Sequence, residues 1–164
     1  MAIAAAWQLF QHHYPRPLPV RETITGSAYA IDGDTLRIDG RRIRLVGIDT
    51  CESGQPARRA GNTIDCGDWA KWLMVEKIRD HRVRCDLHGK DQYGRDLGTC
   101  FSGATDLNKA MLTEGAAFLC ESRDRAPPPG YASAERTAQD ARRGVWSFDQ
   151  VAEPWTYRRE QAGR

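Results

Sequence analysis

Short strand-like runs separated by tight turns fill the first third of the chain, and this pattern limits the fold more than any other feature. Apolar and β-branched residues predict strands at 24–31, 35–38 and 42–48. The turn Asp32-Gly33-Asp34 separates the first two runs, and Asp39-Gly40, which is typical of two-residue hairpins, separates the next two. The first third therefore predicts three hairpin-linked strands.

Two more strands and three helices are expected in the remainder. Residues 82–87 and 97–101 have the strand pattern, whereas the polar stretch from Cys51 to Cys66 is expected to be a loop. The order of elements predicts an α+β fold. Five short strands can close as an oligonucleotide-binding-fold (OB) barrel, here with three helices.

Three capping signals place the helices. Asp68 is expected to cap a helix at about 69–79, with Trp69, Trp72 and Leu73 on one face. A short helix begins after Asp106 and stops at Gly115, and a third runs over about 132–143.

Length and composition fit one domain with terminal extensions. The 164 residues are 40% hydrophobic and 28% charged, as in soluble globular proteins. We expect a domain at 23–148, after a leader, linker or anchor remnant at 1–22 and before a polar tail at 149–164. The net charge of only +2 argues against a large non-specific polyanion binder, so nucleic acid would be bound through local patches. The chain has no Gly-x-Ser-x-Gly motif and no Gly-rich phosphate loop, which counts against serine hydrolases and nucleoside-triphosphate enzymes.

Five cysteines without Cys-x-x-Cys spacing argue against a zinc site and favour disulfides formed in an oxidising compartment. Cys85 and Cys100 lie in two predicted strands and are the first candidate pair. Cys51 with Cys66 is the second candidate pair, which leaves Cys120 over. Five buried free thiols are the alternative interpretation.

Carboxylates at strand ends suggest a cation site. Asp34 and Asp49 each adjoin a predicted strand, and with the carbonyl of Thr50 they supply the hard oxygen donors that suit Ca²⁺. Glu52, three residues after Asp49, is placed to take a proton from a water molecule. Taken singly, these residues also fit a turn cap and solvated loop positions.

Two arginines complete the hypothesis. Arg44 lies in an apolar strand and Arg95 follows a Tyr93-Gly94 turn, so two guanidinium groups can clamp one phosphate. Tyr93 can pack against a nucleotide. Ion pairs with nearby carboxylates are the alternative role for each arginine. Together with the carboxylates, they predict metal-assisted hydrolysis of a phosphodiester.

Three sequence blocks, in matching order and approximate spacing, resemble the staphylococcal nuclease family. They are Ile31 to Thr35, Arg44 to Glu52 and Asp91 to Arg95, and Gly144 to Ser147 resembles the closing segment of the family. The resemblance covers about residues 24–148. It implies an OB barrel with three helices and a Ca²⁺-dependent nuclease that cleaves DNA and RNA and leaves 3′-phosphate ends.

The resemblance also implies roles by position. It makes Asp34 and Asp49 the metal carboxylates, with Thr50 supplying a backbone carbonyl, Glu52 the general base, and Arg44 and Arg95 the phosphate-binding arginines.

The chain departs from the family pattern at several positions. Cys51 stands where the family usually has proline, and Gln92 replaces a basic residue before Tyr93. Residues 118–123 lack the tyrosines that flank the nucleotide in the best-known member, and Arg123 is the substitute candidate as a flat cation.

The cysteines and the Pro154-Trp155 tail resemble those of secreted or periplasmic bacterial relatives. We therefore expect an extracytoplasmic monomer without a stable protein partner, with a possible membrane tether through a missing or trimmed N-terminal segment. An inactive module that binds nucleic acid or protein, and a structural domain of a cell-envelope assembly, are the alternatives. Retention of Arg44, Glu52 and Arg95 favours the enzyme.

Overall fold

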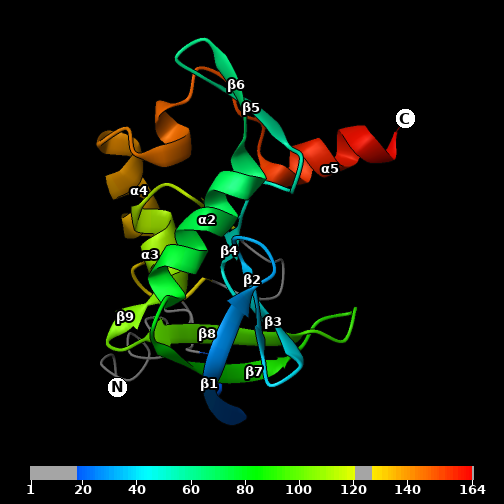
Figure 1. Cartoon of the computed structure of the whole chain (residues 1–164), viewed down its shortest axis with the longest axis vertical. Coiled ribbons are helices and arrows are strands. Elements are labelled where there is room, and N and C mark those ends of the chain that lie inside the picture. The colour runs from blue at the N-terminus through cyan, green and yellow to red at the C-terminus, as the bar shows by residue number, and fades with distance from the viewer. Residues whose placement is uncertain (1–17, 121–126, 164) are drawn as a thin grey trace, which may run out of the picture.

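A computed structural model describes residues 18–120 and 127–163. Five strands form a closed barrel, namely β1 (Glu22–Ala30), β2 (Thr35–Ile38), β3 (Arg41–Leu45), β7 (Arg82–Lys90) and β8 (Asp96–Ser102). The neighbours β3–β2, β2–β1, β1–β7 and β7–β8 are antiparallel, and a parallel β3–β8 pairing closes the ring (Figure 1). The predicted α+β fold with a five-stranded barrel is therefore confirmed.

The barrel interior is filled by alternate residues of the five strands, among them Leu36, Ile43 and Val83, which are fully buried. A Cβ atom on Gly98 would lie 2.7 Å from the side chain of Ile43, so glycine permits β8 to approach β3 where the barrel closes. Cys85 and Cys100 face each other across β7 and β8 and form a disulfide.

Helices α2 (Cys66–Ile78), α3 (Leu107–Thr113) and α4 (Tyr131–Asp140) lie to one side of the barrel (Figure 1). Asp65, rather than the expected Asp68, caps α2, because its side chain accepts the N–H of Asp68. Met74 of α2 is fully buried, whereas Trp72, which was expected on the apolar face of this helix, is 57% exposed. The third expected helix begins at Tyr131 and ends at Asp140, three residues before the predicted end.

Asn108, on α3, ties that helix to the barrel. Its side chain is fully buried, accepts the N–H of Cys100, and donates to the carbonyls of Val46 and Gly98 at 3.0 and 3.1 Å. One amide thus satisfies three buried backbone groups.

The stretch between Cys51 and Cys66 is not the loop that was expected. It holds the hairpin of β5 (Pro56–Arg59) and β6 (Asn62–Asp65), with Ala60 and Gly61 at positive φ in the turn. The polar side chains of this hairpin lack the alternation that marks a half-buried strand, and Ala57 is the one buried residue of its two strands.

Three short strands complete the sheets. β4 (Ile48–Asp49) pairs with β10 (Phe118–Leu119), and β9 (Thr105–Asp106) pairs with β8, both in antiparallel orientation.

The C-terminal segment, predicted as a polar tail, contains a fourth helix, α5 (Pro154–Ala162), which follows a 3₁₀ turn at Gly144–Ser147. The ring centroid of Phe118 lies 5.2 Å from that of Trp146 and 6.0 Å from that of Trp155. Within the described residues, no helix combines the length and apolar character needed to span a bilayer.

We predict that Asn108→Ala lowers the free energy of unfolding by about 3 kcal/mol, because three buried backbone groups lose their partner. Urea denaturation measures the change, with exposed Asn62→Ala as the matched control. An Asn108→Ala protein as stable as the control would contradict this role.

Candidate active site

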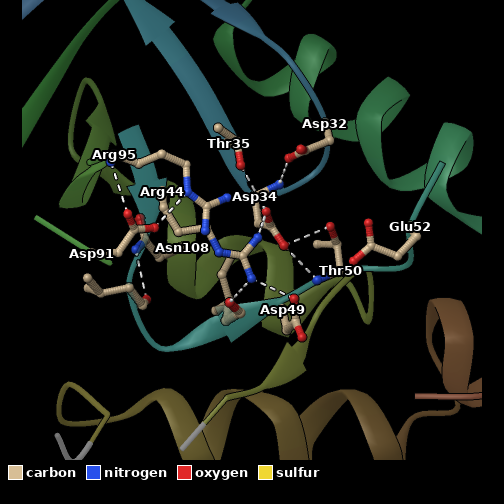
Figure 2. A network of polar contacts seen from close by, with 12 residues as sticks. Asp32, Asp34, Thr35, Arg44, Asp49, Thr50, Glu52, Asp91, Arg95 and Asn108 are labelled. Atoms are coloured by element: carbon tan, nitrogen blue, oxygen red, sulfur yellow. Dashed lines mark hydrogen bonds and ion pairs between the residues drawn. The ribbon is translucent and has the colours of Figure 1, made fainter. Parts of the chain in front are cut away.

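Side chains from the β1–β2 turn, β3 and β4 converge at one end of the barrel (Figure 2). Asp34 follows the turn after β1, Arg44 lies in β3, and Asp49 ends β4. The β2–β3 register places Arg44 opposite Thr35, the residue after Asp34. Strand pairing therefore brings Arg44 to Asp34.

Asp34 is buried, with 2% of its surface exposed. Its Oδ2 accepts the backbone N–H of Thr50 at 2.8 Å and the Thr50 hydroxyl at 3.0 Å. Its Oδ1 accepts the Thr35 hydroxyl and pairs with Arg44. Asp34 thereby holds the end of β4 against the β1–β2 turn.

Arg44 lies between two buried carboxylates. It pairs with Asp34, and its Nη2 lies 2.5 Å from Oδ1 of Asp49 and 3.3 Å from the carbonyl of Ile48. The Asp49 side chain is 2% exposed, so this guanidinium compensates charge that water does not reach.

Glu52 is positioned mainly through its backbone. Its N–H donates to Oε1 of buried Gln55 at 2.9 Å, and its carbonyl accepts the N–H of Gln55. The neighbouring Cys51 forms a disulfide with Cys66 at the start of α2. A Cβ atom on Gly67 would lie 2.1 Å from the carbonyl oxygen of Glu52, so only glycine permits this packing. The side chain of Glu52 is 42% exposed.

Arg158 of α5 completes the cluster, and no sequence pattern predicted it. Its Nη2 lies 2.7 Å from Oδ2 of Asp49, and its Nη1 lies 2.5 Å from Oε1 of Glu52. These hydrogen bonds, with Asp49 first and Glu52 next, raise the pKa of Arg158. Because the partners lie 109 and 106 residues away, no local motif identifies it.

Among the described residues, Arg95 pairs with Asp91 and not with Asp34, Asp49 or Glu52. Its Nε donates to Oδ2 of Asp91 at 2.7 Å, and its guanidinium lies 5.6 Å from the ring centroid of Tyr93, which is 75% exposed. Burial alone would raise the pKa of Asp91, but the side chain of Arg95 and the backbone N–H groups of Arg95 and Tyr93 hold that pKa below its usual value.

A cleft of about 550 Å³ joins the two parts. Arg44, Tyr93 and Arg95 line it together with Cys120, which is a free thiol. Burial raises the pKa of the Cys120 thiol, and the nearby Asp49 adds to that shift. Arg44 thus belongs both to the cleft and to the carboxylate cluster.

The donor chemistry fits a hard cation, since Asp34, Asp49 and the Thr50 carbonyl offer oxygen ligands. The described residues nevertheless contain no group of three acidic, histidine or cysteine side chains arranged to hold a metal. Both oxygens of Asp49 instead accept guanidinium donors. A cation at this site would share Asp49 with Arg44 and Arg158.

The structure therefore brings together Asp34, Arg44, Asp49, Thr50 and Glu52, and places Tyr93 and Arg95 on the cleft that Arg44 shares. Arg123 lies outside the described residues, as do residues 1–17 of the expected leader.

Comparison with known proteins identifies the family of this chain. The family model described as "Staphylococcal nuclease homologue" matches residues 42–148. The chain is 36% identical over 128 residues to succinoglycan biosynthesis protein ExoI of Rhizobium meliloti (strain 1021), covering 76% of this chain and 65% of ExoI.

Two further relatives come from Escherichia coli. Protein ParB is 31% identical over 147 residues, covering 82% of this chain and 78% of ParB. An uncharacterized endonuclease of the O157:H7 strain is 32% identical over 133 residues, covering 78% of this chain and 80% of the relative. The chain belongs to the staphylococcal nuclease family, as its sequence blocks predicted.

We predict that Gln55→Ala lowers the free energy of unfolding by roughly 2 kcal/mol, because the buried amide satisfies the N–H of Glu52 and the carbonyl of Ala152. Chemical denaturation measures the free energy of unfolding, and Gln150→Ala, which truncates an exposed side chain, is the control. Equal stability of the two variants would argue against Gln55 as the support of the Glu52 loop.

We predict that Asp91→Asn destabilises the protein near pH 7 and that the difference from wild type shrinks in acid. A carboxyl whose pKa is lowered on folding contributes stability above its unfolded pKa of about 4, and loses it as the pH falls through the folded pKa. Unfolding at pH 7 and pH 3, with exposed Asp140→Asn as control, measures this. A deficit of the same size at both pH values would contradict it.

Proposed function

We propose that this protein is a Ca²⁺-dependent nuclease that hydrolyses phosphodiesters in DNA and RNA. The observation that carries the proposal is the placement of Arg44, which pairs with Asp34 and Asp49 and lines the same cleft as Arg95. Arg44 thus links the acidic oxygen donors, which suit a cation, to a cleft where two guanidinium groups can bind a phosphodiester.

Each residue of the cluster and the cleft has one role in the proposed reaction. Asp34, Asp49 and the Thr50 carbonyl would hold the cation, which when bound neutralises charge on the phosphate oxygens. Arg44 and Arg95 bind the phosphate and stabilise the charge of the five-coordinate transition state. Glu52 takes the proton from the attacking water, as the bond from phosphorus to the leaving oxygen breaks. Tyr93, exposed beside Arg95, packs against a sugar or base.

The disulfides support an extracytoplasmic location, since such bonds persist in oxidising compartments. We further propose a monomer without a stable protein partner, in which residues 1–22 are a leader or the remnant of a tether. The nuclease names among the relatives support nucleic acid as the substrate.

One observation favours a second candidate, an inactive module that binds nucleic acid. Arg158 pairs with both Asp49 and Glu52, the residues assigned to the cation and to the water. In that function the cluster would be structural, and bound nucleic acid would stay intact.

We predict that Glu52→Gln lowers cleavage by about 10²–10⁴-fold, because the variant lacks the general base while keeping the shape of the side chain. The assay uses single- and double-stranded DNA and RNA, with Ca²⁺ or a chelator. Glu160→Gln, at an exposed position of α5, is the matched control.

Near-normal cleavage by Glu52→Gln would remove Glu52 from the mechanism. Nucleic acid that binds to the wild type with Ca²⁺ present but remains uncut would favour the binding module instead.

A further inference from the structure

Helix α5 brings a third guanidinium group to the carboxylate cluster. Arg158 donates to both carboxylate oxygens of Asp49, at 3.3 Å to Oδ1 and 2.7 Å to Oδ2, and to Glu52 at 2.5 Å. Arg44 also donates to Oδ1 of Asp49. Both oxygens of Asp49 therefore accept arginine donors, and in the part of the chain that the structure describes Arg158 is the residue that connects Asp49 to Glu52.

The contact depends on how α5 is docked. Pro154, four residues before Arg158, is buried, and Trp155, three residues before it, packs edge-on against Phe118. Residues three and four apart share one face of a helix. The docked face of α5 is thus the face that carries Arg158.

Hydrogen bonds to its backbone groups hold the segment that leads into α5. The carbonyl of Ala152 accepts the amide of buried Gln55 at 2.7 Å. Arg58 of β5 donates its N–H to the carbonyl of Gln150 and accepts the N–H of Asp149, each at 2.8 Å. Arg158 is therefore presented by an anchored helix that rests on the same hairpin and loop as Glu52.

The charges define what this contact does. Asp34, Asp49 and Glu52 carry three negative charges, and Arg44 and Arg158 carry two positive ones. Without Arg158 the cluster would have two net negative charges instead of one. Since the Arg158 side chain is 46% exposed, whereas that of Arg44 is 19% exposed, Arg158 is the cation that can leave at lower cost.

We infer that Arg158 is a positioning residue that competes with the divalent cation for Asp49 and sets the cation concentration at which the site is loaded. The inference rests on the proposed role of Asp49 as a cation ligand. While Arg158 is in place it holds Asp49 and Glu52 together. With a cation bound, Asp49 would serve as its ligand, and the Arg158 guanidinium would move aside into solvent.

The test is calcium titration calorimetry of the full chain without nucleic acid. Arg158→Gln is expected to bind Ca²⁺ about three- to tenfold more tightly than wild type, because a competing, partly exposed ion pair is gone. Arg158→Lys, which keeps the charge, should remain near wild type. Arg159→Gln, on the same helix with its side chain on Thr156, should leave the affinity unchanged.

A second variant tests the docking of the helix. Trp155→Ala removes the contact with Phe118 but keeps Arg158, and it too should tighten Ca²⁺ binding. Asp49→Asn should abolish the binding and so identifies the site. Urea denaturation of each variant establishes that it is folded.

Unchanged or weaker Ca²⁺ affinity in folded Arg158→Gln would overturn the inference, as would the absence of Ca²⁺ binding by every protein tested. Cleavage of nucleic acid is assayed separately. Tighter Ca²⁺ binding with no cleavage by any protein would reject the nuclease function and leave the competition standing. Cleavage by wild type with no effect of Arg158 on affinity would reject the competition alone.

Discussion

The ion pairs of Arg44 with Asp34 and Asp49 are the interaction on which the site depends. Both carboxylates are nearly inaccessible to water, and an isolated buried charge is costly. The guanidinium compensates both and joins the β1–β2 turn, β3 and β4. Such a pair adds little net stability by itself, but its loss would leave buried Asp34 without the guanidinium that it pairs with, and Asp49 with Arg158 as its remaining cation. Arg44 therefore fixes the site geometry whatever its role toward a substrate.

The barrel makes that geometry possible. Arg44 pairs with Thr35 on one side and with Leu97 of β8 on the other, so closure of the ring determines where its side chain emerges. Asn108 fixes α3 to the same closure point through Gly98 and Val46. The carboxylate cluster is thus built at the rigid edge of the barrel, whereas Glu52 is held by a disulfide-tied loop.

Residues whose surroundings are set by local chemistry could be predicted from the sequence. The strand at 35–38 was predicted at its observed bounds, because polar Asp-Gly turns flank it on both sides. The carboxylates were found because each adjoins a strand. The β5–β6 hairpin lacked an apolar alternation, and the exposed Trp72 lies on a helix whose buried face is formed by small residues, Met74 and Ile78. The role of Arg158 depends on a contact across more than 100 residues, which no local pattern encodes.

The C-terminal segment is joined to the barrel through Asp49. Asp49 is shared by Arg44, which is part of the barrel, and by Arg158, which belongs to α5. Gln55 joins the loop of Glu52 to Ala152, directly before that helix. A change in the charge at Asp49 therefore alters two ion pairs, one with Arg44 of the barrel and one with Arg158 of the C-terminal helix. Because Arg44 is enclosed and Arg158 is half exposed, the helix is the side that can respond.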